Sequence, residues 1–280
     1  MTNYQSTLQV PNLELIDGRP IPQLGFGVFE VPAEETEEAV AHALQVGYRL
    51  IDTAAMYGNE AEVGEAIRHS GLDRDDVFIT TKVWNDDHGR EPTVRAFEQS
   101  LERLGLDTVD LYLIHWPAPG QGKYVDSWKA MCELKEAGRA RSIGVSNFLP
   151  EHLERVIDAT GTVPVINQVE LHPRFQQHDL RRFHREHGIV TESWSPLGRG
   201  ALLDDEVVKA IARDIGRTPA QVLLRWNVQL GCVVIPRSVR PERIEENSGI
   251  FEFELDQSQM EAIEGLERGQ RIGPDPASFG

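Results

Sequence analysis

Leu111-Tyr112-Leu113-Ile114-His115-Trp116-Pro117 is the stretch that decides the fold class of this 280-residue chain. Its first four residues are apolar without interruption, which is typical of a strand buried on both faces of a parallel sheet. The earlier run Val77-Phe78-Ile79 has the same character. We therefore predict a parallel sheet whose strands are covered on both faces.

Strand-like runs recur along the chain and alternate with helix-like runs. Ahead of them, residues 13–19 form a predicted hairpin with Asp17-Gly18 at its turn, within an N-terminal hairpin region of about residues 7–22. Eight strands are predicted after the hairpin, around residues 23–27, 48–53, 77–83, 109–115, 141–146, 164–171, 189–195 and 232–237.

Two of the intervening segments carry their apolar residues on one face of a helix. The first ends at Gly47 and has its apolar face at Val40, Ala43 and Leu44. The second starts near Pro92, ends at Gly105, and has its apolar face at Val94, Phe97, Leu101 and Leu104. Strands that alternate with such helices belong to the α/β class of folds.

Eight strand–helix repeats in one chain predict a closed (β/α)8 TIM barrel, as a single domain over residues 1–280 with a short C-terminal tail of about residues 267–280. The main competitor is an open doubly wound sheet, which binds dinucleotides through a G-x-G-x-x-G turn. The nearest candidate, Gly25-Phe26-Gly27, lacks the third glycine and is followed by Pro32 rather than by a helix. That counts against the open sheet.

Composition narrows the class of partner. The formal net charge is −17 at pH 7, which argues against binding to nucleic acid or to an anionic membrane surface. The two cysteines, Cys132 and Cys232, are too few for a disulfide framework and fit a reducing compartment. We see no signal peptide and no apolar run near the ~18 residues that span a membrane. We expect a cytoplasmic monomer that acts on a small molecule.

Polar residues lie at the carboxyl ends of three successive predicted strands and would meet at one rim of the barrel, where the active sites of this fold lie. They are Asp52, Lys82 and His115, with Tyr57 in the loop after the first of these strands. A carbonyl that accepts hydride needs a proton, and free Tyr, with a pKa of about 10, is a weak donor near neutrality. A neighbouring cation lowers that value. We therefore predict Tyr57 as general acid, Lys82 as the cation, Asp52 as its partner and His115 as a donor to the substrate oxygen.

Each of these residues alone has a structural explanation, as a helix cap, a solvated lysine or a structural histidine. Their convergence on one rim favours the catalytic interpretation. Glu170 and Glu192 could instead indicate a barrel glycosidase with paired carboxylates, but that chemistry would not use Tyr57 or Lys82.

Three histidines on one segment, His178, His184 and His187, could indicate a metal site. Arginines are interleaved with them, so we predict a solvated helix and no metal site.

The chain resembles the aldo-keto reductase family over almost its whole length, and within it the prokaryotic branch that contains 2,5-diketo-D-gluconate reductases. The resemblance is carried by motifs at residues 24–28, 51–54, 57–60, 81–85, 115–117, 143–148, 167–170, 195–198 and 235–238. It implies NADPH-dependent reduction of aldehydes, α-dicarbonyls or keto-sugars. The family's catalytic tetrad would fall on Asp52, Tyr57, Lys82 and His115.

The resemblance also implies a cofactor site and a substrate pocket. Ser146, Asn147 and Gln168 would bind the nicotinamide carboxamide, and Trp194 would stack on the ring. The arginine-rich segment 237–243 would bind the adenosine 2′-phosphate. The full cofactor set is Val28, Ser146, Asn147, Gln168, Trp194, Ser195, Leu197, Arg237, Ser238, Val239, Arg243, Glu246 and Asn247, and the pocket set is Phe29, Trp84 and Trp116.

Two positions depart from the common family pattern. Arg237 stands where lysine is frequent, which keeps the charge, and Phe29 stands where tryptophan is frequent, which could reshape the pocket. A second function stays open, because one fold hosts many activities. In that alternative the chain is a regulatory protein that binds NADPH and turns over slowly.

Overall fold

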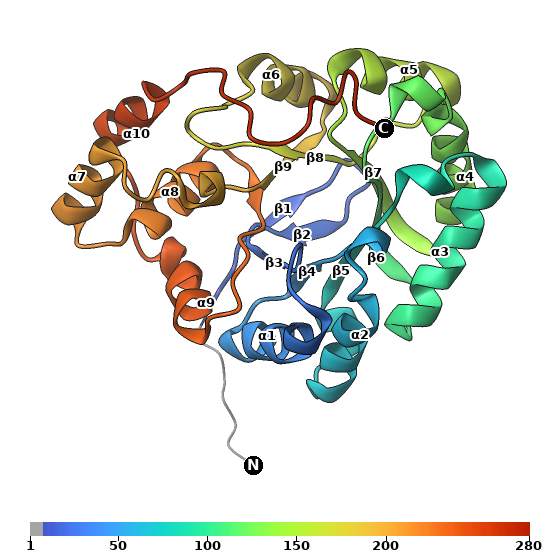
Figure 1. The fold of residues 1–280 in the computed structure, drawn as a ribbon, viewed down its shortest axis with the longest axis horizontal. Coiled ribbons are helices and arrows are strands. Elements are labelled where there is room, and N and C mark those ends of the chain that lie inside the picture. The colour runs from blue at the N-terminus through green and yellow to red at the C-terminus, as the bar shows by residue number, and fades with distance from the viewer. Residues whose placement is uncertain (1–7) are drawn as a thin grey trace.

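Eight parallel strands stand at the centre of the computed structural model, which describes residues 8–280 (Figure 1). Neighbouring strands pair in sequence order from β3 to β10, and Val234 N donates to Gln23 O across the gap between the last and the first (3.0 Å). The predicted TIM barrel is confirmed. Its strands are β3 (Gly25–Gly27), β4 (Leu50–Asp52), β5 (Phe78–Val83), β6 (Val109–Ile114), β7 (Ala140–Ser146), β8 (Ile166–Glu170), β9 (Val190–Trp194) and β10 (Val233–Val234).

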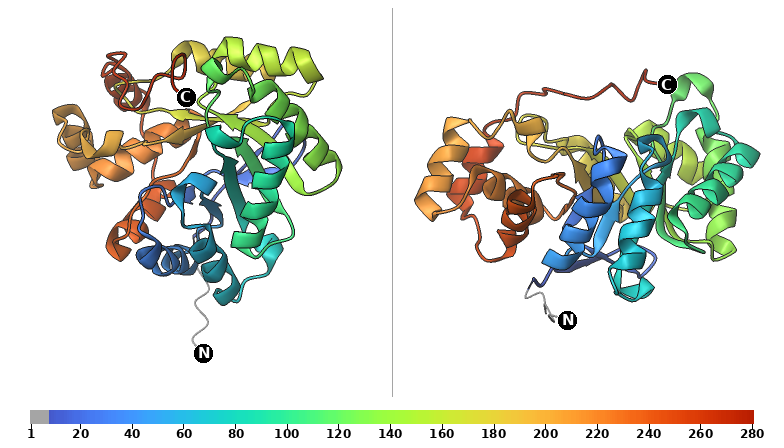
Figure 2. Two further views of the ribbon diagram at one scale, coloured as in Figure 1. Left: turned by 45° about the vertical axis from the view of Figure 1, so that its right-hand side comes forward. Right: turned by 60° about the horizontal axis from the view of Figure 1, so that its bottom comes forward.

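Helices surround this barrel, as the views in Figures 1 and 2 show. Within the described chain, no helix is long and apolar enough to cross a membrane. The helices are α1 (Ala33–Val46), α2 (Glu60–His69), α3 (Arg90–Leu104), α4 (Tyr124–Glu136), α5 (Pro150–Thr160), α6 (His178–His187), α7 (Glu206–Ile215), α8 (Pro219–Gln229), α9 (Pro241–Ser248) and α10 (Gln257–Glu264).

The N-terminal hairpin is present and closes one end of the barrel. β1 (Asn12–Glu14) pairs antiparallel with β2 (Pro20–Pro22), and Gly18 in the turn has a φ of 80°, a conformation that glycine adopts without a steric cost. Buried Leu15 and Ile21 join the apolar cluster inside the barrel. Residue 7, the expected start of the hairpin region, lies outside the described residues.

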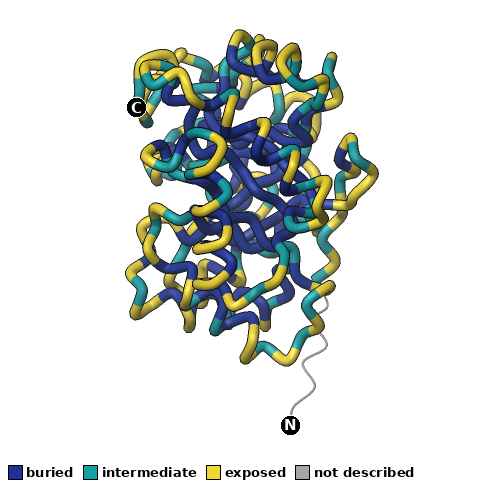
Figure 3. Tube along the Cα trace, turned by 90° about the vertical axis from the view of Figure 1, so that its right-hand side faces the viewer, coloured by how far each residue is buried: buried dark blue, intermediate teal, exposed yellow. Residues whose placement is uncertain are grey.

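Side chains of β6 alternate between two buried faces, which explains why residues 111–114 are continuously apolar. Leu111 and Leu113 belong to the cluster inside the barrel, whereas Tyr112 and Ile114 belong to the cluster between the sheet and the helices. Phe97 of α3 meets Tyr112 with ring centroids 4.7 Å apart. Both faces of the strand are therefore buried, and the buried interior is visible in Figure 3.

The two predicted helical faces are confirmed as well. Val40, Ala43 and Leu44 are buried on α1, and Gly47 ends that helix in the left-handed conformation. On α3, Phe97, Leu101 and Leu104 are buried and Val94 is half-buried.

The interpretation of α6 as a solvated helix is wrong for one of its faces. His184 is fully buried, and its two ring nitrogens lie 3.0 Å from Asn167 Nδ2 on β8 and 2.8 Å from Thr191 Oγ1 on β9. Burial holds the pKa of His184 at about 3, so the ring is neutral. It is a structural residue that connects the helix to the sheet.

Candidate active site

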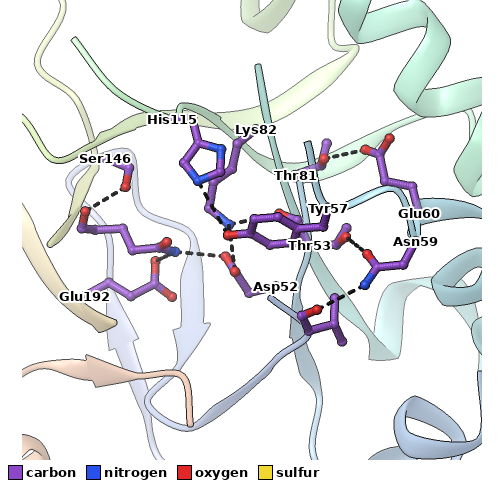
Figure 4. Close-up of polar contacts among 12 residues, drawn as sticks. Asp52, Thr53, Tyr57, Asn59, Glu60, Thr81, Lys82, His115, Ser146 and Glu192 are labelled. Atoms are coloured by element: carbon purple, nitrogen blue, oxygen red, sulfur yellow. Dashed lines mark hydrogen bonds and ion pairs between the residues drawn. The ribbon is translucent and has the colours of Figure 1, made fainter. Parts of the chain in front are cut away.

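The four predicted catalytic residues meet at the carboxyl end of the barrel (Figure 4). Lys82 Nζ lies 2.6 Å from Asp52 Oδ1 and 3.3 Å from Tyr57 Oη. His115 Nε2 lies 3.5 Å from the same phenolic oxygen. Asp52 ends β4, Lys82 lies near the end of β5, and His115 directly follows β6, so parallel neighbouring strands bring the side chains together.

Lys82 is fully buried and nevertheless charged. Burial alone would lower its pKa, but the attraction of Asp52 and their hydrogen bond outweigh burial and raise the pKa above its ordinary value. Thr53 O accepts a further hydrogen bond from Nζ at 2.9 Å. The ammonium group is therefore held in one position, with its third N–H toward Tyr57.

Tyr57 is protonated in this environment. Burial raises its pKa and the Lys82 charge lowers it, and the balance leaves the pKa at about 12. Lys82 thus acts in the expected direction, although burial outweighs it. A phenol in this state has a proton to give, and the adjacent cation stabilises the phenolate that donation leaves behind.

His115 is a neutral imidazole. Burial, with a smaller contribution from the Lys82 charge, holds its pKa well below the ordinary value. Its Nδ1 atom is buried without a partner among the described residues. Asn147 Nδ2 donates to the backbone oxygen of His115 at 3.0 Å, which ties the end of β6 to the loop after β7.

A second set of polar contacts holds the loop that carries Tyr57. Asn59 Nδ2 donates to Val28 O (3.0 Å) and Val31 O (3.2 Å), and Asn59 Oδ1 accepts from Thr53 Oγ1 (3.0 Å). Gly58 has a φ of 69°, which allows the turn after Tyr57. The sequence did not indicate this role of Asn59, because Val28 and Val31 lie on a different loop.

A cavity of about 700 Å³ opens above the tetrad. It is lined by most of the predicted residues: Asp52, Tyr57 and His115 of the tetrad, Phe29, Trp84 and Trp116 of the pocket, and Ser146, Asn147, Gln168, Trp194, Ser195, Leu197, Arg237 and Arg243 of the cofactor set.

Other predicted residues do not line this cavity. Val28 is fully buried in the core, and its backbone N–H donates to Asp52 O (3.1 Å). Glu246 accepts a hydrogen bond from Thr218 Oγ1 at 2.7 Å, and Asn247 is buried on α9. Ser238 and Val239 lie in the segment between β10 and α9, outside the lining.

The cavity floor is a continuous polar network. Trp194 Nε1 donates to Asn147 Oδ1 (2.8 Å), and Asn147 Nδ2 donates to Ser146 Oγ (3.0 Å). Ser146 Oγ donates in turn to the backbone oxygen of Gln168 (2.8 Å), and Gln168 Nε2 donates to Asp52 Oδ2 (2.8 Å). The residues expected to bind a nicotinamide are therefore connected to the tetrad itself.

The arginines after β10 differ in what they contact. Arg237 Nη1 donates to Glu30 O at 3.0 Å and lies 3.9 Å from the Glu30 carboxylate. Arg243 is exposed at the cavity edge, and no carboxylate between residues 8 and 280 pairs with its guanidinium group. Arg243 is thus free to bind an anionic group.

The C-terminal segment forms part of the cavity wall, which the sequence did not reveal. It crosses the mouth of the barrel in Figure 2. Phe279 lies against Trp116 and Trp84, with ring centroids 4.6 and 6.4 Å apart. The backbone N–H groups of Ile272 and Gly273 donate to the buried Glu170 carboxylate at 2.6 and 2.8 Å.

The two carboxylates that could have indicated a glycosidase have other partners. Glu170 accepts from the C-terminal segment and lies 3.0 Å from His172 Nε2. Glu192 accepts from Gln168 Nε2 at 2.9 Å. Neither lines the cavity, so Glu170 and Glu192 do not form a carboxylate pair that faces a substrate.

The fold and the site define a barrel enzyme of the oxidoreductase class, with Tyr57 beside the buried Lys82–Asp52 pair at the end of an aromatic cavity. The model of the Aldo/keto reductase family matches residues 23–268. The chain belongs to this family, and the resemblance seen in its motifs is confirmed.

Individual relatives are similar along nearly the whole chain. An aldo-keto reductase of Mycolicibacterium smegmatis is 56% identical over 96% of this chain and 98% of its own. Methylglyoxal reductase DkgA of Yersinia pestis is 50% identical over 96% of this chain and 98% of its own. The crystal structure of a Gox0644 variant in complex with NADPH has a TM-score of 0.94 at 51% identity, and covers 97% of this chain and 99% of that one.

Proposed function

We propose that this enzyme reduces small aldehydes, α-dicarbonyls or keto-sugars to alcohols with NADPH, and that Tyr57 is the general acid. The observation that carries the proposal is the position of Tyr57 Oη, between Lys82 Nζ (3.3 Å) and His115 Nε2 (3.5 Å) at the base of the cavity. No other acidic group in the lining stands beside both a buried cation and a neutral imidazole.

The residues present fit the cofactor. NADPH supplies a hydride when bound, and the Trp194 indole at the cavity wall offers a surface for stacking. Gln168 Oε1 accepts no hydrogen bond within residues 8–280, which suits an amide N–H2 group. Unpaired Arg243 suits a phosphate, because guanidinium groups bind phosphate oxygens through charge-assisted hydrogen bonds.

The protein's own residues would divide the chemistry as follows. His115 Nε2 donates to the substrate oxygen and orients the carbonyl group. Tyr57 Oη gives its proton to that oxygen as negative charge develops there. Lys82, held by Asp52, stabilises the resulting phenolate. All three steps need the neutral imidazole and the charged ammonium group that burial and ion pairing produce here.

The cavity favours small substrates. Phe29, Trp84, Trp116 and Phe279 give it aromatic walls, and the C-terminal segment narrows its mouth. A relative at 50% identity carries the name methylglyoxal reductase, which supports an α-dicarbonyl.

An NADPH-oxidation screen across a carbonyl panel tests the proposal. We expect turnover with methylglyoxal and small aldehydes, and a much lower kcat/KM with a bulky steroid ketone. Preference for the steroid ketone would contradict the substrate class. Tight NADPH binding without turnover on any carbonyl would instead support the regulatory alternative.

A further inference from the structure

Glu192 is a fully buried carboxyl group beside the tetrad that the proposed mechanism does not use. It lies on β9, and Figure 4 shows it on the side of Asp52 opposite to Asn59. Its Oε2 atom accepts a hydrogen bond from Gln168 Nε2 at 2.9 Å. The register of β8 and β9 pairs Gln168 directly with Glu192, so this contact is built into the sheet.

The amide group of Gln168 donates to two carboxyl groups at once. One N–H goes to Asp52 Oδ2 (2.8 Å) and the other to Glu192 Oε2 (2.9 Å). A flipped amide would direct Oε1 at the acceptor-only carboxylate oxygen of Asp52, which is repulsive. The two contacts therefore fix the Gln168 amide in the orientation in which Oε1 points away from both carboxyl groups. No group between residues 8 and 280 donates a hydrogen bond to this Oε1 atom.

Two carboxyl groups on one amide would repel each other if both were ionised. Asp52 is paired with the charged Lys82 (2.6 Å). Burial and the nearby Asp52 charge raise the pKa of Glu192 above its ordinary value, which favours the neutral acid. A neutral carboxyl group still accepts at one oxygen, so Glu192 can hold Gln168 without adding a second buried charge.

We propose that Glu192 is a positioning residue, which fixes the Gln168 side chain so that Oε1 faces the cavity and accepts from a ligand amide. The inference rests on the proposed function, in which that amide is the carboxamide of the cofactor. Asp52 alone would anchor one N–H and leave the other free to turn toward the ligand. With both anchored, the site presents an acceptor and selects a carboxamide over a group that lacks N–H donors.

A cofactor analogue provides a direct probe. The 3-acetylpyridine analogue of NADP⁺ replaces the amide N–H2 by a methyl group of similar size and keeps the carbonyl. Its Kd and that of NADP⁺ can be measured by quenching of tryptophan fluorescence, without turnover. We expect wild type to bind NADP⁺ about 2- to 13-fold more tightly, which is the range for one neutral hydrogen bond.

The variants Glu192→Met and Glu192→Gln test the role of the carboxyl group. Glu192→Met removes the acceptor at similar volume, and we expect the preference for NADP⁺ to disappear because only NADP⁺ binds more weakly. Glu192→Gln keeps an acceptor oxygen and should retain the preference. Ser193→Ala, on the same strand as Glu192, is the matched control. It removes a buried hydrogen bond from Ser193 Oγ to Leu171 O without touching Gln168.

Three results would overturn the inference. Equal weakening of both ligands in Glu192→Met would make Glu192 a packing residue only, and an unchanged preference would mean that Asp52 suffices. Loss of the preference in Glu192→Gln would contradict the acceptor role even if Glu192→Met did not fold. Gln168→Leu separates this from the proposed function: if it keeps the preference, the carboxamide is bound elsewhere and the proposed cofactor contact is wrong.

Discussion

Lys82 shows how a single residue determines the chemistry of its neighbour. It is as buried as the core side chains around it, yet Asp52 at 2.6 Å keeps it protonated. The Lys82 charge opposes the effect of burial on the pKa of Tyr57. The acid strength of Tyr57 is thus set by a balance that one substitution can disturb.

Lys82→Met should make Tyr57 a weaker acid without removing its hydroxyl group. Tyr57 must be protonated to donate, so activity in the reductive direction falls as pH rises through its pKa. Because Lys82 lowers that pKa, its removal should move this alkaline limb to higher pH and reduce kcat at pH 7 by about 10²-fold or more. A pH profile of kcat measures both effects.

The exposed Lys129→Met provides the control and should leave the profile unchanged. An alkaline limb at the same pH in Lys82→Met would show that a group other than Tyr57 titrates.

The polar residues of the site could be predicted from the sequence because each lies at the end of an apolar strand or in the loop after it. The role of Glu192 could not, since it depends on the register that places Gln168 beside it. The same holds for Phe279, which lies far along the chain from Trp84 and Trp116 and has no local pattern of its own. Buried His184 was misjudged, because the arginines around it in the sequence indicate solvent.

At the scale of elements, the barrel strands were predicted to within a few residues. The last strand, Val233–Val234, is shorter than the predicted residues 232–237. Backbone contact with its neighbours continues for two residues, since Ile235 N donates to Ser193 O (3.3 Å) and Pro236 O accepts from Gly27 N (3.1 Å), but Pro236 has no N–H group with which to extend the ladder. On β7, Gly144 lies where the neighbouring strands leave no room for a side chain. A Cβ atom there would stand 2.7 Å from Ile166 Cγ2 and 2.8 Å from Ile166 O.

Gly144→Ala should therefore destabilise the barrel by about 1–3 kcal/mol, the usual cost of overpacking. Denaturant unfolding measures the change in free energy. Gly265→Ala is the control, because its Cβ would meet nothing closer than 3.4 Å and its φ of −62° suits alanine. Equal stability of the two variants would show that β7 and β8 can separate at no cost.

The C-terminal segment is an element whose position depends on one carboxylate. Glu170→Ala removes the acceptor of the Ile272 and Gly273 N–H groups. We expect faster amide hydrogen exchange in residues 271–280 and a higher KM for small carbonyls, because Phe279 no longer packs on Trp116. The fold should persist, since the barrel does not depend on these contacts. Unchanged exchange and KM would mean that the aromatic contacts alone hold the segment.

At the scale of the whole molecule, charge poses a problem for an anionic cofactor. The chain has a net charge of −17, and a 2′-phosphate adds about −1.5 to −2, by analogy with other phosphomonoesters. Local cations must offset this field, and the unpaired guanidinium of Arg243 is available at the cavity edge.

Arg243→Ala should raise the Kd for NADPH about tenfold or more and leave the Kd for NADH nearly unchanged. The effect should shrink at high salt, because Arg243 is exposed and screening weakens its interaction. Fluorescence titration of both cofactors measures it, with Arg182→Ala, an exposed arginine on α6, as a matched control. Equal weakening of NADH and NADPH would show that Arg243 supports the loop rather than binding the phosphate.

The most direct test of the account is the single-turnover rate of NADPH oxidation by Tyr57→Phe, measured with methylglyoxal beside the Kd for NADPH. Phe keeps the ring and its contacts with Phe29 and His115 but has no proton to donate. We predict a rate lower by about 10²–10⁴-fold, the usual contribution of general acid catalysis, with the Kd for NADPH within about twofold of wild type. A rate close to wild type with the same Kd would contradict Tyr57 as the proton donor.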